Sequence, residues 1–244
     1  MNASSKSIWG VSMLNVSQLN QYYGTSHTLR GVSLQVEKGQ CLALLGRNGV
    51  GKTTLLKCLM GVLPVAKGSV MFQGRDITRL KPHERAALGI AYVPQGREIF
   101  ARLTVEENLL MGMAVKPGRQ AAKIKGEVFE LFPVLKEMLH RRGGDLSGGQ
   151  QQQLAIARAL LADPKLIIFD EPTEGIQPSI IKDIGNVVRL LRERGDIAIL
   201  LCEQYFDFAH ALADQFIVLS RGEVVASGSQ ATMGGEDVKR HLAV

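Results

Sequence analysis

The chain is poor in cysteine, in aromatic residues and in long apolar runs. Of its 244 residues, 3 are cysteine and 5% are aromatic. An odd number of cysteines without a C-x-x-C spacing argues against a disulfide framework and predicts reduced thiols. No apolar run approaches the roughly 20 residues that cross a bilayer, and no apolar segment follows the lysine within residues 1–7. We therefore expect neither a membrane-spanning helix nor a secretory signal.

The charge of the chain is modest, and its basic residues are scattered. A net charge of +6 suits contact with a polyanion, an anionic membrane face or a nucleotide, and does not decide between them. The few aromatic residues do not alternate with basic ones, as they do on platforms for single-stranded nucleic acid, so we expect no nucleic-acid partner. The apolar content of 45% is enough for a packed core.

Two kinds of strand pattern are separated by a long helical stretch. Apolar and polar residues alternate over 13–19, which is typical of a strand with one solvated face. Residues 166–169 and 197–201 are continuously apolar, as in strands buried within a parallel sheet. Between the alternating pattern and the continuously apolar ones, residues 104–139 have helical periodicity. We predict an α/β fold with a mixed sheet, an antiparallel part near its start, and a helical subdomain inserted at about 95–160.

The sequence GRNGVGKT at residues 46–53 has the G-x-x-x-x-G-K-[ST] pattern of a phosphate-binding P-loop. It follows an apolar strand pattern and precedes an apolar helix pattern, the context that this loop requires. Glycines let successive backbone N–H groups point at phosphate oxygens, and the helix start adds its positive dipole end. The residues predicted to bind the nucleotide here are Gly46, Arg47, Asn48, Gly49, Gly51, Lys52, Thr53 and Thr54. Lys52 is expected to reach the β- and γ-phosphates, and the Thr53 hydroxyl to ligate Mg²⁺.

Two carboxylates follow the buried strand pattern at 166–169. Asp170 is positioned to hold the Mg²⁺ that bridges ATP phosphates, because ligands bind at the carboxyl ends of parallel strands. Glu171 can orient or deprotonate an attacking water. A strand that ends in Asp-Glu often only marks solvent, but its combination with a P-loop favours the catalytic interpretation.

A second anion cradle is predicted at Ser147, Gly148, Gly149 and Gln150, which precede a helix pattern. One ATP does not need two cradles from the same chain. The simplest arrangement is a head-to-tail dimer, in which each ATP lies between the P-loop of one subunit and the Ser-Gly-Gly of the other. The structural alternative is a hinge with a helix cap.

Together, GRNGVGKT, LSGGQ and LIIFDE resemble the ATP-binding subunits of ABC transporters, in the order and spacing of that family. The resemblance covers about residues 12–228 as a single domain and leaves 1–11 and 229–244 as short extensions. It implies that Tyr23 stacks on adenine and that Gln95 senses Mg²⁺ and couples to the membrane subunit. It also implies docking of the helical subdomain onto a permease.

The sequence departs from the general family pattern at two places. Gln204 occupies the position of a switch histidine that contacts the γ-phosphate; an amide can donate a hydrogen bond there but does not take up a proton. Residues 174–177 lack an aspartate that is often present. These features resemble importers for branched-chain amino acids and short amides, and residues 95–100 and 171–179 resemble the urea type most.

The expected function is therefore ATP hydrolysis, carried by Glu171, Lys52 and Gln204, that energises a permease importing urea or short-chain amides. A branched-chain amino acid importer is the alternative. The resemblance implies ATP and Mg²⁺ as ligands, membrane permeases and a second ATPase subunit as partners, and indirectly a solute-binding protein. It implies a location on the cytoplasmic face of the membrane. Rival interpretations are a soluble ABC ATPase that acts on DNA or ribosomes and a regulatory module that does not hydrolyse ATP.

Overall fold

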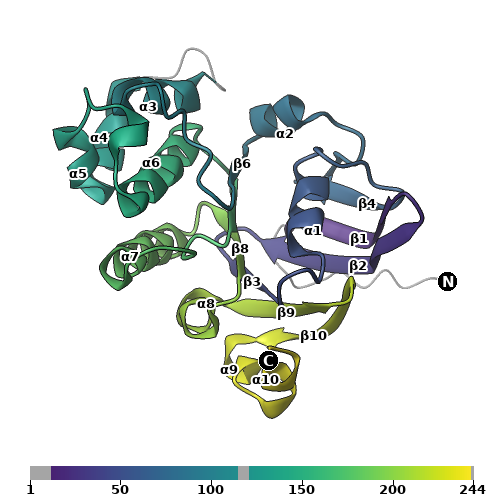
Figure 1. Cartoon of the computed structure of the whole chain (residues 1–244). Helices are drawn as coiled ribbons and strands as arrows, with labels where there is room; N and C mark the ends of the chain where they lie inside the picture. Colours follow the sequence, from purple (N-terminus) through teal and green to yellow (C-terminus); the bar gives the residue numbers. More distant parts are fainter. Residues whose placement is uncertain (1–11, 115–120, 243–244) are drawn as a thin grey trace.

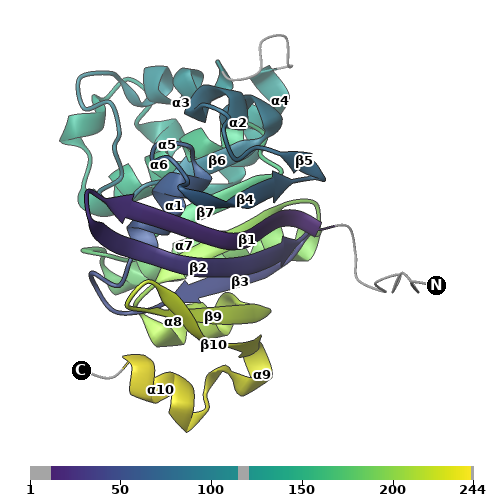
Figure 2. The ribbon, with the colours of Figure 1, turned by 90° about the vertical axis from the view of Figure 1, so that its right-hand side faces the viewer.

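The computed structural model describes residues 12–114 and 121–242, in which strands precede and follow a group of helices (Figures 1 and 2). The predicted N-terminal extension, residues 1–11, lies outside the described residues. The strands are β1 (Ser12–Tyr23), β2 (Ser26–Glu37), β3 (Cys41–Leu45), β4 (Lys67–Phe72), β5 (Arg75–Asp76), β6 (Ile90–Val93), β7 (Leu166–Asp170), β8 (Ala198–Glu203), β9 (Gln215–Ser220) and β10 (Glu223–Ser229). The helices are α1 (Lys52–Leu59), α2 (Pro82–Leu88), α3 (Val105–Met113), α4 (Ala121–Leu131), α5 (Pro133–Glu137), α6 (Gly148–Leu161), α7 (Pro178–Arg194), α8 (Phe206–Leu212), α9 (Gln230–Met233) and α10 (Glu236–Leu242), with a 3₁₀ helix at Gly143–Asp145.

The strands form two sheets of different character. The four-stranded sheet has the order β2-β1-β4-β5, and all its neighbours are antiparallel. The six-stranded sheet has the order β10-β9-β3-β8-β7-β6; β3, β6, β7, β8 and β9 pair in parallel, and β10 pairs antiparallel to β9 at the edge. Every residue of β3, β7 and β8 is buried, as their apolar sequences predict, and burial extends to the acidic last residues of β7 and β8. The predicted α/β fold with an antiparallel part is confirmed.

The parallel register brings the carboxyl ends of three strands to one edge. Leu45 of β3 lies opposite Glu203 of β8, and Asp170 of β7 lies opposite Cys202 of β8. The P-loop follows β3, so it is held next to the carboxylates that follow β7. This register places the phosphate loop and the acidic residues at the same edge of the sheet.

The helices α3 to α6 form a group to one side of the strands, apart from the antiparallel sheet (Figure 1). Their apolar side chains pack in one cluster with residues of the parallel sheet, including Phe132, Leu154 and Phe169. Two of the helices begin with reciprocal caps: Thr104 with Glu107 at α3, and Ser147 with Gln150 at α6. No helix among the described residues has the length and apolarity to cross a bilayer.

The residues after β10 fold back onto the sheet. Met233 of α9 and Val238 of α10 are buried in an apolar cluster that also contains Phe216 and Val218 of β9. The sequence predicted only a short extension over residues 229–244, because the apolar positions there are few and far apart. The domain limits of 12 and 228 stay predictions.

A buried arginine fixes the end of the P-loop helix. Arg85 of α2 is 1% exposed, and its Nη1 donates to the backbone oxygens of Cys58 and Leu59 at 2.7 and 2.6 Å. Its other nitrogens donate to the backbone oxygens of Leu80 and Thr78 at 3.0 and 2.9 Å. Arg85 thus satisfies carbonyls at the carboxyl end of α1, where a positive charge is favoured by the helix dipole.

We predict that Arg85→Ala lowers the free energy of unfolding by about 3 kcal/mol, because four carbonyl oxygens lose their donor inside the protein. Chemical denaturation measures this change. Arg75→Ala, which removes an exposed arginine of β5, is the matched control and should stay within about 0.5 kcal/mol of wild type. Equal effects of the two substitutions would contradict the anchoring role of Arg85.

Candidate nucleotide and hydrolysis site

A polar cavity of about 480 Å³ lies at the carboxyl edge of the parallel strands. Tyr23, Gln95 and Glu171, from three distant parts of the chain, line it together with the P-loop; the P-loop residues are Arg47, Asn48, Gly49, Gly51, Lys52, Thr53 and Thr54. Tyr23 is 49% exposed at this cavity. Gly46 lies in an adjoining depression together with Gln204. The structure therefore brings the predicted residues of the first phosphate site together around this cavity and the depression that adjoins it.

The P-loop backbone has a shape that side chains would prevent. Gly46 and Gly51 have φ angles of 154° and 111°. A Cβ at Gly46 would lie 2.5 Å from the backbone oxygen of Leu219, so this position accepts glycine alone without a shift of β9. Gly51 is also the N-cap of α1, and no side chain caps this helix start, which suits phosphate binding at a helix N-terminus.

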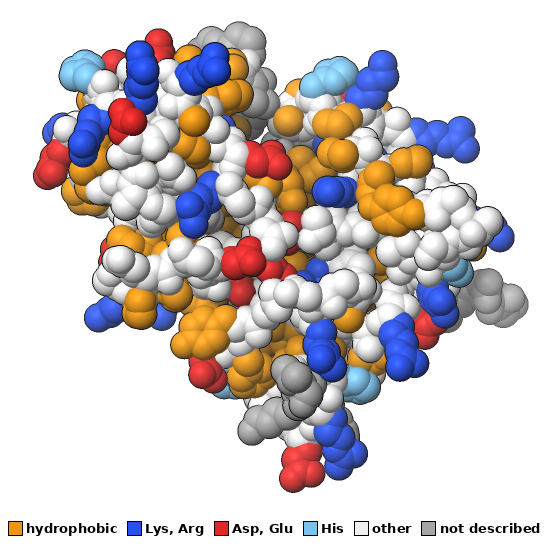
Figure 3. All heavy atoms as spheres, viewed as in Figure 1, with side chains coloured by type: hydrophobic (Ala, Val, Ile, Leu, Met, Phe, Trp, Pro, Cys, Tyr) orange, Lys and Arg blue, Asp and Glu red, His pale blue; other side chains and the backbone are white. Residues whose placement is uncertain are grey.

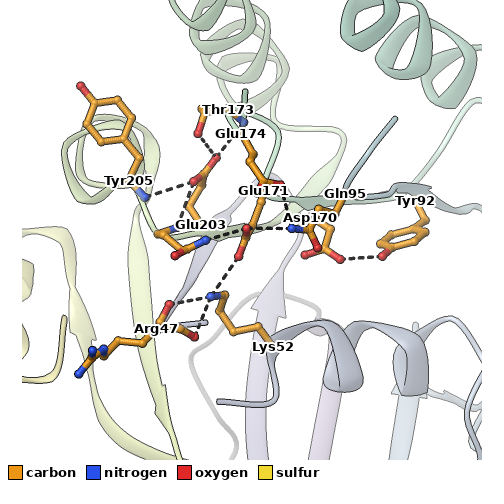
Figure 4. A network of polar contacts seen from close by, with 12 residues as sticks. Arg47, Lys52, Tyr92, Gln95, Asp170, Glu171, Thr173, Glu174, Glu203 and Tyr205 are labelled. Atoms are coloured by element: carbon orange, nitrogen blue, oxygen red, sulfur yellow. Dashed lines mark hydrogen bonds and ion pairs between the residues drawn. The ribbon is translucent and has the colours of Figure 1, made fainter. Parts of the chain in front are cut away.

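Lys52 and Glu171 form a buried ion pair in this cavity (Figure 4). The Lys52 Nζ lies 3.1 Å from Glu171 Oε1, and the two side chains are only 4% and 5% exposed. The same ammonium donates to the backbone oxygens of Gly46 and Arg47 at 2.6 and 3.1 Å. Lys52 therefore lies between the loop that would hold phosphate and the carboxylate that would activate water.

Asp170 has a carboxylate oxygen suited to a metal ion. Its Oδ2 accepts a hydrogen bond from the Tyr92 hydroxyl at 2.8 Å, whereas its buried Oδ1 has no N–H or O–H donor among the described residues. Burial raises the pKa of Asp170, and the Tyr92 hydrogen bond opposes that rise. An orphaned carboxylate oxygen fits the oxygen ligands that Mg²⁺ prefers, and Thr53 lines the P-loop cavity. Thr53 and Asp170 are the residues that would hold Mg²⁺.

The second oxygen of Glu171 is held by two amides. Gln204 Nε2 donates to Glu171 Oε2 at 2.7 Å, and Gln95 Nε2 lies 3.4 Å from the same oxygen. Gln95 donates more closely, at 2.8 Å, to Glu174 Oε2. Glu171 itself has a φ angle of 50°, which a non-glycine residue adopts rarely. Glu171 is therefore held by side chains from the segments that follow β3, β6 and β8. Acidic side chains gather near the middle of the face that Figure 3 shows.

The predicted second cradle lies in a different place. Ser147, Gly148, Gly149 and Gln150 line a cavity of about 340 Å³ whose other lining residues include Gly175 and Gln177. None of its lining residues lines the P-loop cavity. Ser147 Oγ accepts from Gln150 N at 3.3 Å, so the serine also caps α6, as the structural alternative supposed. One chain thus keeps its two cradles apart.

Sequence reasoning missed two residues of the hydrolysis site. Tyr92 lies within the apolar sequence of β6, and nothing local indicates that its hydroxyl contacts Asp170. Glu174 was noticed only as part of a stretch that lacks an aspartate, although it binds the side chain of Gln95. The two contacts join residues that are 78 and 79 positions apart in the sequence.

Comparison with known proteins agrees with this geometry. The family model described as "ABC transporter" matches residues 29–174. The high-affinity branched-chain amino acid transport ATP-binding protein BraG of Pseudomonas aeruginosa is 41% identical over 91% of this chain and 94% of its own length. The probable branched-chain amino acid transport ATP-binding protein LivF of Archaeoglobus fulgidus is 37% identical, over 89% and 92%. A nucleotide-free ATP-binding cassette from an ABC transporter superposes with a TM-score of 0.80 at 30% identity, covering 96% of each chain.

The fold and the site define a P-loop ATPase that uses ATP and Mg²⁺. The chain belongs to the ABC transporter family, as a subunit that couples ATP hydrolysis to transport. The resemblance inferred from the motifs is confirmed.

We predict that Tyr92→Phe raises the Mg²⁺ concentration for half-maximal ATP hydrolysis about 10-fold, because Asp170 loses the hydrogen bond that orients it. Steady-state hydrolysis over a Mg²⁺ titration measures this shift. Tyr22→Phe, at an exposed tyrosine, is the matched control and should leave the midpoint unchanged. An unchanged midpoint in Tyr92→Phe would show that the Tyr92 hydroxyl does not orient the metal ligand.

Proposed function

We propose that this chain energises a membrane importer of the branched-chain amino acid and short-amide branch. The observation that carries the ATPase part is Glu171, held between the ammonium of Lys52 and the amide of Gln204 beside the P-loop cavity. The relatives named for branched-chain amino acid transport support this branch.

The cargo has two candidates within that branch. Urea or a short-chain amide is favoured by the sequences at 95–100 and 171–179, which resemble the urea type. A branched-chain amino acid is favoured by the names of the relatives at 41% and 37% identity. The ATPase does not itself contact cargo in this proposal, so transport has to decide between them.

In the proposed reaction, Glu171 accepts a proton from the water that attacks the γ-phosphorus, while the bond from that phosphorus to the β–γ bridging oxygen breaks and ADP leaves. Gln204 and Lys52 keep the carboxylate in position, and Lys52 also neutralises phosphate charge. When bound at Thr53 and Asp170, Mg²⁺ neutralises charge on the phosphate oxygens. Gln95 links this site through Glu174 to the loop that follows β7, and Tyr23 supplies a face for adenine at the rim of the cavity.

Two chains, or this chain and a related one, complete the reaction site. The P-loop cavity and the Ser147–Gln150 cavity have no lining residue in common, which supports a head-to-tail pair with one ATP at each joint. The proposed partners are integral-membrane permease subunits, with this chain peripheral at the cytoplasmic face of the membrane, and, indirectly, a solute-binding protein. A soluble ABC ATPase acting on DNA or ribosomes is the rival; it predicts activity without a permease.

We predict that Ser147→Arg leaves ATP binding by the isolated chain within about twofold of wild type and lowers hydrolysis at least about 100-fold. The reason is that an arginine at the second cradle blocks a partner's ATP but not the chain's own P-loop. Titration with a fluorescent ATP analogue at low protein concentration measures the first quantity, and phosphate release at high concentration measures the second. Ser227→Arg, on the exposed face of β10, is the matched control. Loss of binding by the isolated chain would contradict the two-chain site.

Uptake assays test the transport function. Cells without their own uptake system would express the chain with permease subunits and a solute-binding protein of this importer branch, and would receive labelled urea or labelled leucine. We expect uptake of one cargo, and Glu171→Gln should lower it about 100-fold or more because the general base is lost while the P-loop remains. Uptake that is equal with and without the chain would refute the proposal.

A further inference from the structure

A buried carboxylate lies outside the nucleotide cavity, at the end of β8. Glu203, the last residue of β8, is 2% exposed and does not line the P-loop cavity. No lysine, arginine or histidine among the described residues forms an ion pair with it. A carboxylate without a cation inside a protein needs several hydrogen bonds to remain there.

Glu203 obtains these bonds from two different loops, and each oxygen serves one of them (Figure 4). Oε1 accepts from the backbone N and the Oγ1 of Thr173, at 3.2 and 2.8 Å. Oε2 accepts from the backbone N of Gln204 and of Tyr205, at 3.0 and 3.3 Å. The first loop follows β7 and Glu171, and the second follows β8 and begins with Gln204.

All four partners are donors, which suits an ionised carboxylate and no neutral side chain of the same shape. An ionised carboxylate only accepts, whereas glutamine presents an NH₂ group to one of the two loops. Burial raises the pKa of Glu203, and the hydrogen bonds from Thr173, Tyr205 and Gln204 oppose that rise. Hydrogen bonds to an ionised acceptor are about twice as strong as neutral ones, so this connection between the loops is firm.

The two connected loops carry the two ends of the Gln204–Glu171 hydrogen bond. Glu171 lies two positions before Thr173, and its Oε2 accepts from Gln204 Nε2 at 2.7 Å. If the loops separated by about 1 Å, this hydrogen bond would break, and misplacement of that size can cost about 100-fold in rate. Glu203 is therefore placed to control the geometry of the base without touching the substrate cavity.

We propose that Glu203 is a positioning residue for ATP hydrolysis: it fixes the loop after β7 to the loop after β8 and so holds Gln204 against Glu171. The proposal rests on ATP hydrolysis by this chain and is independent of the cargo. Glu203 is not a second base, because hydrogen-bond donors from the protein occupy both its oxygens.

Steady-state kinetics of the full-length chain test the proposal. Glu203→Gln should lower kcat about 10-fold or more while the KM for ATP stays within about twofold, because the P-loop cavity keeps its lining. Glu193→Gln makes the same chemical change at an exposed site of α7 and should have no effect. An unchanged kcat in Glu203→Gln would overturn the proposal.

A double-mutant cycle separates positioning from general stabilisation. If Glu203 acts through Gln204, then Glu203→Gln should cost less than about twofold in a Gln204→Ala background. An equal loss in both backgrounds, or a parallel loss of ATP binding, would indicate a merely structural role and overturn the proposal. Neither outcome depends on transport, so failure of the uptake experiment would be distinguishable.

A milder variant covers the case in which Glu203→Gln does not fold. Thr173→Val removes the hydroxyl that donates to Glu203 at 2.8 Å and leaves the three backbone hydrogen bonds in place. Its kcat should fall about threefold with an unchanged KM for ATP. Thermal unfolding of each variant identifies loss of fold, and an unchanged kcat in a folded Thr173→Val chain would count against the proposal.

Discussion

The buried ion pair between Lys52 and Glu171, 3.1 Å apart, joins the P-loop to the carboxyl end of β7 and depends on the register of the parallel strands. An ion pair taken out of water is stable only when hydrogen bonds satisfy what remains of each charge. Two backbone oxygens of the P-loop do this for Lys52, and the amide of Gln204 does it for Glu171. These groups follow β3 and β8, so the parallel register of strands β3, β8 and β7 is what allows the pair to exist.

The parts that could be predicted from the sequence have local causes. The all-apolar sequence 166–169 predicts a buried parallel strand because its length suits a strand and because a parallel strand is covered on both faces. The P-loop can be recognised because its glycines, lysine and threonine all lie in one short segment, formed by a turn and the start of the helix that follows. The grouping of Tyr23, Gln95 and Glu171 around one cavity is not local; the motifs anticipated it through family resemblance and not through spacing.

The parts that could not be predicted depend on which side chains meet across the fold. In the sequence, Tyr92 is a tyrosine within an apolar strand, and Glu174 and Glu203 are acidic residues without a motif of their own. Each meets its hydrogen-bond partner only through the strand register and the shape of the loops. The packing of α10 has the same origin. Val238 and Met233 contribute to a core whose remaining members lie in β3, α8, β9 and the residue after α8, so the pattern within residues 229–244 does not reveal what they pack against.

The glutamine at position 204 changes what the loop after β8 can contribute. An amide does not take up a proton near neutral pH, so Gln204 cannot receive the proton that Glu171 removes from water. Gln204 therefore contributes by orienting Glu171, and this orientation depends on how firmly the backbone of Gln204 is anchored. Glu203 provides that anchoring through the N–H groups of Gln204 and Tyr205. Burying the Glu203 carboxylate is costly in itself. In return, it anchors the backbone from which the Gln204 amide orients Glu171.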